Sequence, residues 1–321
     1  MPRLRPVPTL TVPTSIVLRL MVACLCLMPP GPLAAAPQGP SPVALIMSGP
    51  DSRGHATGLL LGAWQAGVWK MPAAALPLLK GSQPWRMQSL GQPGRPGQPP
   101  TPGQTLLRTG GAALPTDQPC PETIFLDFIL PAAFATASAS DFLLVTAPGL
   151  KVRPRPVEVL PTSSDVYRQS VRAELARRGL QTPVLNINSV TRADLDGDGT
   201  LEVIIEASHF RLQASGNFAP PPRAEAGDYS LLLLRWVKNG QVQTTALYQN
   251  VFTKTPTQAQ LEAGGGQVPS RYGLAGVADL NADGHMELVV ADAYYEGEGA
   301  AVLEWSPTTG AKERLNQGCG A

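Results

Sequence analysis

Charged side chains are scarce in this sequence of 321 residues, at 15% of the total, whereas a typical globular protein has about a quarter. The formal net charge is only +1, so no surface field of a single sign would attract nucleic acid or anionic lipid. We therefore expect no nucleic-acid partner. The hydrophobic fraction of 43% is enough for a substantial core at this length and excludes wholesale disorder.

Recognisable catalytic machinery is also lacking. The sequence has no G-x-S-x-G nucleophile motif, no phosphate-binding loop and no dinucleotide fingerprint, and cysteine and histidine never cluster at zinc-ligand spacing. We therefore predict no catalytic residues. The sequence has three histidines, His55, His209 and His285, of which His209 and His285 are interpreted as surface or supporting residues. Three carboxylates without an assigned role keep a hydrolase as an alternative: Asp228, Glu296 and Glu298.

Proline and glycine, by contrast, are abundant. They number 34 and 32, about a fifth of the chain where roughly 12% is usual, which predicts short elements joined by many turns. Residues 91–103, GQPGRPGQPPTPG, cannot form a packed helix or strand and are interpreted as a long loop or linker. Short apolar runs bounded by turn residues predict strands at 43–47, 58–64, 123–130 and 141–146.

One helix is predicted over 164–179. Residues 163–165, Ser-Ser-Asp, offer an N-cap, and Gly179 supplies a stop. Glu174 and Arg178 stand at the i,i+4 spacing of a helical ion pair. The apolar residues that recur at helical spacing are Val166, Tyr167, Val171 and Leu175.

The first 36 residues have the order of a secretory signal peptide. A basic region without acidic residues precedes an apolar stretch at 20–28, and the small residues 34–36 precede Pro37. We therefore predict cleavage after Ala36 and a secreted, periplasmic or cell-surface protein. The apolar stretch is too short for a permanent membrane span, which needs about 20 residues. A later start at Met21 and lipid attachment at Cys24 are the alternatives.

Removal of this leader would leave two cysteines, Cys120 and Cys319. An even number of cysteines in an exported chain predicts a disulfide, because oxidising compartments favour the bridge. Two unrelated free thiols are the alternative.

The C-terminal half contains an internal sequence match. TRADLDGDGTLEVIIEA, from Thr191, and GVADLNADGHMELVVAD, from Gly276, align without a gap at an offset of 85 residues. Each is followed by an apolar run that ends in tryptophan and a turn, at 231–240 and 301–310, and 58–67 is a weaker third example. Repetition of a whole supersecondary unit predicts a repeat architecture.

Each matching segment contains an acidic loop with oxygen-bearing side chains at positions 1, 3, 5 and 9 and glycine at position 6. Such oxygens, with a backbone carbonyl at position 7, are typical of a Ca²⁺ site, whereas Mg²⁺ demands stricter octahedral geometry. An acidic turn that binds nothing is the alternative. The predicted ligands of the first loop are Asp194, Asp196, Asp198, Glu202 and the carbonyl of Thr200. Those of the second are Asp279, Asn281, Asp283, Glu287 and the carbonyl of His285.

Position 12 distinguishes these loops from an EF-hand. That motif needs a bidentate glutamate there, but Ile205 and Val290 occupy the position. The residues after each loop are short apolar runs rich in β-branched side chains, so we predict that each loop leads into a buried strand rather than a helix.

Residues 185–310 resemble the VCBS and FG-GAP repeats, calcium-loop repeats of bacterial exported proteins and integrin-type β-propellers. The resemblance implies a mostly β, propeller-like fold, complete or partial, in which the ion is structural. Because the offset exceeds one ordinary blade, it also implies an unmarked blade or a large insertion between the two loops. The predicted organisation is a signal peptide at 1–36, a β-rich N-terminal region at 37–160 and a repeat region at 161–321.

The function implied by this resemblance is that of a binding, adhesion or surface-interaction module with an unidentified glycan or protein ligand. A calcium-stabilised extracellular hydrolase and a purely structural envelope protein are the alternatives. Four aromatic residues after the repeat strands could stack on a sugar or pack in the core: Phe210, Phe218, Tyr294 and Tyr295.

Overall fold

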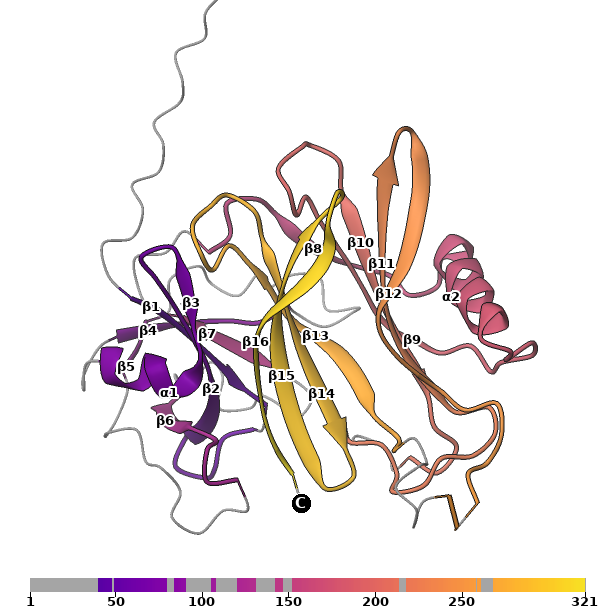
Figure 1. The fold of residues 1–321 in the computed structure, drawn as a ribbon, viewed down its shortest axis with the longest axis horizontal. Coiled ribbons are helices and arrows are strands. Elements are labelled where there is room, and N and C mark those ends of the chain that lie inside the picture. The colour runs from indigo at the N-terminus through magenta and orange to yellow at the C-terminus, as the bar shows by residue number, and fades with distance from the viewer. Residues whose placement is uncertain are drawn as a thin grey trace, which may run out of the picture. The chain divides into compact units, whose positions relative to one another are not determined.

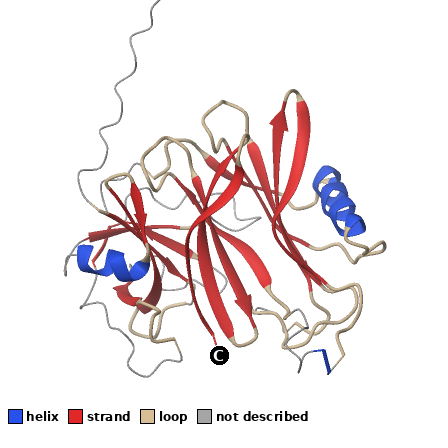
Figure 2. Cartoon of the chain, viewed as in Figure 1, coloured by secondary structure: helices blue, strands red, loops and turns tan. Residues whose placement is uncertain are grey.

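Among the residues that it describes, the computed structural model has three antiparallel β-sheets and two short α-helices (Figures 1 and 2). The structure describes residues 40–47, 49–79, 84–90, 105–107, 120–130, 142–146, 152–213, 218–257, 259–260 and 268–320. The predicted leader and the predicted loop at 91–103 lie outside these residues. The prediction of a mostly β chain is confirmed, and the described residues form no closed barrel or propeller.

The N-terminal sheet, here sheet A, has the strand order β3-β2-β1-β7-β4-β5, with β6 paired to the other part of β2. Its central strand β1 is fully buried, as expected of a short apolar run. Strands β1, β2, β6 and β7 confirm the four strands predicted in this region. The strands are β1 (Ser41–Ile46), β2 (His55–Gln65), β3 (Val68–Lys70), β4 (Pro84–Gln88), β5 (Thr105–Leu107), β6 (Phe125–Ile129) and β7 (Leu143–Thr146).

Sheets B and C are meanders in which consecutive strands pair. The two matching sequences each form a pair of antiparallel strands joined by an acidic loop, β9–β10 in sheet B and β13–β14 in sheet C. The strands of sheet B are β8 (Val157–Leu160), β9 (Ile187–Ala193), β10 (Glu202–His209), β11 (Tyr229–Lys238) and β12 (Gln241–Val251). Those of sheet C are β13 (Arg271–Ala278), β14 (Glu287–Tyr294), β15 (Gly297–Ser306) and β16 (Gly310–Gly320).

The 85-residue offset has a simple structural explanation. No strand of the described chain lies between β12 and β13, and much of the added length is in the connections 210–228 and 252–270. This favours the insertion over an unmarked blade. The three apolar runs that end in tryptophan all lead into hairpin turns, namely β2–β3, β11–β12 and β15–β16.

Sheet C lies between sheets A and B, although it is last in the sequence (Figure 1). One core joins Leu45 and Leu61 of sheet A to Val289 and Val302 of sheet C. A second core joins the other face of sheet C to sheet B, and Trp305 meets Trp236 there with ring centroids 5.9 Å apart. Burial of each large apolar side chain stabilises the fold by about 1.5–3 kcal/mol. Both faces of sheet C are therefore core.

Helix α2 (Asp165–Arg177) confirms the predicted helix and packs on the outer face of sheet B through Val171 and Leu175. Glu174 pairs with Arg178 at 2.9 Å, as predicted, and also with Arg177. Ser164 occupies the N-cap position, but its side chain makes no capping hydrogen bond, so that part of the prediction was wrong. The short helix α1 (Pro72–Ala75) and the 3₁₀ turn η1 (Leu76–Leu78) pack on sheet A, on the face opposite to the one that meets sheet C.

None of the described helices is both long and apolar enough to cross a bilayer.

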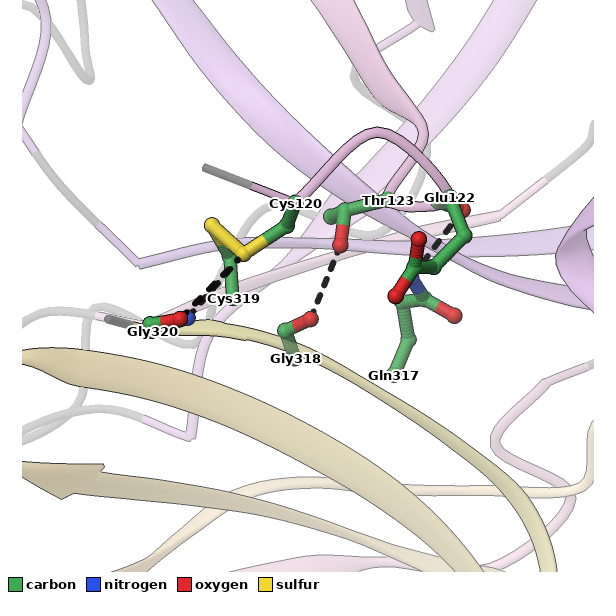
Figure 3. The surroundings of a disulfide bond; sticks show 7 residues. All are labelled: Cys120, Glu122, Thr123, Gln317, Gly318, Cys319 and Gly320. Carbon is green, nitrogen blue, oxygen red and sulfur yellow. Dashed lines mark hydrogen bonds between the residues drawn. A yellow bond between two sulfur atoms is a disulfide. The ribbon is translucent and has the colours of Figure 1, made fainter. Parts of the chain in front are cut away.

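The predicted disulfide between Cys120 and Cys319 is present, with Cα atoms 5.5 Å apart (Figure 3). It joins the segment before β6 of sheet A to the last strand of sheet C. Close to it, the Thr123 hydroxyl donates to the Gly318 carbonyl at 2.8 Å. The alternative of two free thiols is therefore excluded, and sheets A and C are held together by a covalent bond as well as by their shared core.

Candidate metal centre

The two acidic loops occupy equivalent places in their sheets. Loop 1 (residues 194–202) joins β9 to β10, and loop 2 (residues 279–287) joins β13 to β14. In each hairpin the position-9 glutamate is the first residue of the second strand, and it lies opposite the alanine that ends the first strand: Glu202 opposite Ala193, and Glu287 opposite Ala278. The buried strands therefore fix where each loop begins and ends.

The first and last acidic side chains are held by the same backbone contacts in both loops. Glu202 accepts a hydrogen bond from the Leu195 N–H at 2.7 Å, and Glu287 accepts one from the Leu280 N–H at 2.7 Å. At position 1, each aspartate accepts from the glycine at position 6, at 3.3 Å in loop 1 and 3.1 Å in loop 2. These contacts turn the position-1 and position-9 carboxylates toward the loop interior.

The middle side chains also repeat their contacts. Asp196 and Asn281, at position 3, accept from the N–H of position 5 at 3.2 Å and 2.9 Å. Asp198 and Asp283, at position 5, accept from the N–H of Thr200 and His285 at 2.6 Å and 2.7 Å. Four equivalent hydrogen bonds therefore shape each loop, and the chain can turn because the position-6 glycines have φ of +85° and +90°.

Three of the four predicted carboxylates of loop 1 converge. One oxygen from each of Asp194, Asp196 and Glu202 lies within 4.8 Å of the others, so these residues could hold a metal ion. Asp198 is more exposed and lies outside this group. In loop 2 the amide of Asn281 replaces the second carboxylate, so an acidic triad of the same composition cannot form there.

Burial makes these carboxylates hard to ionise without a partner. Glu202 and Glu287 are only 2% and 1% exposed. Desolvation, reinforced by the neighbouring aspartates, raises the pKa of Glu202 to about 7 and that of Glu287 to about 9. Burial also raises the pKa of Asp279, with Asp283 contributing in the same direction. A buried carboxylate of this kind must take up a proton or a cation.

Asp279 supplies the most specific observation. Its side chain is 6% exposed, and its Oδ2 accepts from Gly284, but its Oδ1 is buried without any hydrogen-bond partner. Leaving a buried acceptor unsatisfied costs about 1–3 kcal/mol, and more when the group is charged. A cation held by the loop would satisfy this oxygen, so the residues present fit an oxygen-coordinated ion.

Loop 1 has an additional contact that the sequence did not reveal. The Arg155 guanidinium donates to the backbone carbonyls of Asp194 at 2.6 Å and Leu195 at 3.0 Å, and its Nε lies 3.6 Å from the Asp194 carboxylate. Arg155 lies about 40 residues upstream, just before β8, so no local pattern points to this contact. It places a positive charge beside the acidic loop.

The other residues considered from the sequence do not gather at these loops. Phe210 is buried, and Phe218 packs edge-on against Phe142, with ring centroids 4.9 Å apart, so both have core roles. Tyr295 is exposed. Asp228 is fully buried and accepts from the N–H groups of Arg211 and Glu225, which gives it a structural role in a turn.

A small pocket of about 120 Å³ adjoins loop 2. Asp283 and His285 form one wall, and the β15–β16 hairpin supplies Glu304, Lys312 and Arg314 on the other. Arg314 pairs with Glu304 at 2.5 Å, and the Trp69 indole N–H donates to the second oxygen of Glu304 at 2.7 Å. The pocket thus combines hydrogen-bond donors and acceptors next to a candidate ion site.

Comparison with known proteins identifies no relative, because no family model, curated protein or solved structure matches the chain. The geometry of the two loops is therefore the best indication of function.

Proposed function

We propose that loops 1 and 2 each bind Ca²⁺ and that the protein is an exported, calcium-stabilised binding module of the VCBS/FG-GAP type. The observation that carries this proposal is the set of four hydrogen bonds that recurs in both loops around buried carboxylates, one of which has an unsatisfied oxygen. Sheets B and C would correspond to two blades of an open, propeller-like array.

The donor chemistry favours calcium over other divalent cations. Both loops offer only oxygen, from carboxylates, one amide and backbone carbonyls, whereas Zn²⁺ sites are usually built from cysteine and histidine. Ca²⁺ accepts six to eight oxygens in flexible geometry, while Mg²⁺ requires a strict octahedron and keeps several waters. In loop 1 the ion would be held by Asp194, Asp196 and Glu202, and in loop 2 by Asp279, Asn281 and Glu287. Its chemical contribution would be to compensate their charge.

A binding role is supported by the position of the pocket beside loop 2. Its acidic and basic side chains, which are the ion pair of Glu304 with Arg314 together with Asp283 and Lys312, can donate and accept hydrogen bonds, as a polar ligand such as a glycan requires. Calcium in loop 2 would fix the wall that carries Asp283. The disulfide is compatible with an oxidising compartment, which supports export.

Thermal unfolding of the full chain in EGTA, Ca²⁺ and Mg²⁺ tests the calcium proposal. A site with Kd of about 0.1 mM stabilises the fold by roughly 1.4 kcal/mol at 1 mM Ca²⁺, because stabilisation equals RT ln(1 + [L]/Kd). We expect the melting temperature to rise by a few degrees in Ca²⁺ and little in Mg²⁺.

Asp279→Asn should remove part of the calcium-dependent gain, while the matched control Asp127→Asn, an exposed acid on β6, should retain it. A melting temperature that is indifferent to EGTA, together with no heat of Ca²⁺ binding in calorimetry, would overturn the proposal. Mass spectrometry of the exported protein tests the localisation separately, with Pro37 as the expected first residue.

A further inference from the structure

The two loops touch each other directly. The N–H of Met286, at position 8 of loop 2, donates to the carbonyl of Leu195, at position 2 of loop 1, at 2.8 Å. Both side chains are almost fully buried in the core shared by sheets B and C. The contact is therefore a shielded hydrogen bond between two loops that are 85 residues apart in the sequence.

This hydrogen bond connects the two position-9 glutamates. Leu195 uses its N–H to hold the Glu202 carboxylate at 2.7 Å and its carbonyl to hold Met286 at 2.8 Å. Met286 is covalently joined to Glu287, which closes loop 2. A change in the position of either glutamate would thus reach the other through the backbone of Leu195 and one hydrogen bond.

A second connection runs through the segment 152–155, here called the strap. At one end, the Val152 carbonyl accepts from the N–H of Asp279, at position 1 of loop 2, at 2.8 Å. At the other end, Arg155 donates to the carbonyls of Asp194 and Leu195 in loop 1. Pro154 lies between them and restricts the backbone. The strap therefore fixes the first residues of both loops to one short, stiff segment.

We infer that the two cation sites are coupled, so that an ion in either loop raises the affinity of the other. This inference rests on the proposed function. An ion that draws the oxygens of one loop together also shifts Leu195 or Met286 and, through the strap, the first residue of the other loop toward their ion-bound positions. The second ion then meets a loop whose oxygens already lie closer to those positions, which gives positive cooperativity. Simple charge repulsion between two cations would act in the opposite direction.

The test uses Asn281→Ala, which removes a loop 2 ligand without changing the charge of the protein. Ca²⁺ is titrated into the full chain labelled with ¹⁵N-glycine, and the amide signals of Gly199 and Gly284 report loop 1 and loop 2 separately. We expect the variant to weaken binding at loop 1 by about fivefold or more, the lower end of typical couplings. The wild-type titration should be cooperative, and that of the variant should not.

Two controls keep the outcomes distinct. Asp127→Asn should leave both sites as in the wild type, and circular dichroism should show that Asn281→Ala is folded. If that variant does not fold, Asp279→Asn replaces it, read at the Gly199 signal in 0.5 M KCl to screen the change of charge. If the wild type binds Ca²⁺ at both loops and the variant binds more weakly at loop 2 but with unchanged affinity at loop 1, the coupling alone is overturned. Absence of binding in the wild type would overturn the proposed function with it.

Discussion

Calcium binding at neutral pH should release protons from the buried glutamates. Without a cation, burial raises the pKa of Glu202 to about 7 and that of Glu287 to about 9. At pH 7, Glu287 then carries about one proton and Glu202 about half of one, so filling both loops should release about 1.5 protons per chain. The raised pKa of Asp279 acts in the same direction. At pH 10 the release from the two glutamates should fall to about 0.1 proton.

The same shifts determine how stability depends on pH. Both glutamates bind a proton more tightly in the calcium-free folded chain than in the unfolded chain, where the pKa is about 4.5. Their contribution to the free energy of unfolding in EGTA should therefore be greatest below pH 4.5 and fall as the pH rises, up to pH 7 for Glu202 and pH 9 for Glu287. Each pH unit within these windows costs at most about 1.4 kcal/mol per glutamate. Saturating Ca²⁺ should largely remove this dependence.

Isothermal titration calorimetry at pH 7 in PIPES, HEPES and Tris measures the proton release, because the observed heat varies linearly with the ionisation enthalpy of the buffer. The slope of this line equals the number of protons released. In Glu287→Gln, with calcium bound at loop 1, it should be lower by about one proton. A slope of zero in the wild type, in a titration that shows two bound calcium ions, would contradict the predicted release, because it would mean that both glutamates are already ionised.

Three further predictions concern residues around the sheets. Arg155→Gln removes both a positive charge beside loop 1 and the contacts of the strap to that loop, so in 0.5 M KCl, where the charge is screened, it should weaken calcium binding at the Gly199 signal; an unchanged affinity there would contradict this. Replacing both Cys120 and Cys319 by serine should lower the free energy of unfolding, measured in urea, by up to about 5 kcal/mol. Equal urea midpoints for the wild type and the double variant would contradict this prediction. Leu175→Ala should cost about 2–5 kcal/mol by leaving a cavity under α2; a comparable loss in the exposed control Val166→Ala, where alanine improves helix propensity, would contradict the cavity explanation.

Local patterns in the sequence were sufficient for the acidic loops and for part of the secondary structure, but they did not predict β3, β4, β5, β8 or α1. The strands, the helix and the position of the oxygen side chains depend on residues close together in the chain, and the structure bears out β1, β2, β6, β7 and α2. The disulfide could be predicted because only one pairing was open after the leader was set aside. The N-cap failed at Ser164 because residue type alone does not determine where a hydroxyl points.

Long-range contacts account for what the sequence did not predict. Arg155 reaches loop 1 from about 40 residues away, and Met286 reaches Leu195 across two sheets. Neither contact corresponds to a periodicity or a fixed residue spacing in the amino-acid sequence, because each depends on how separate sheets pack. The amino-acid sequence does not determine the order in which the sheets stack, for the same reason. Sheets B and C have similar buried strands, so either of them could pack against sheet A.

The place of sheet C between its neighbours has a consequence for how the chain is made. Until residues 271–320 have been synthesised, sheets A and B each lack the surface that covers one apolar face, and Cys120 lacks its partner. Exposed faces of this kind favour aggregation of incomplete chains. The nascent protein must therefore remain in a shielded, immature state until its final strand emerges, and ribosome-bound fragments that end before β13 should bind chaperones.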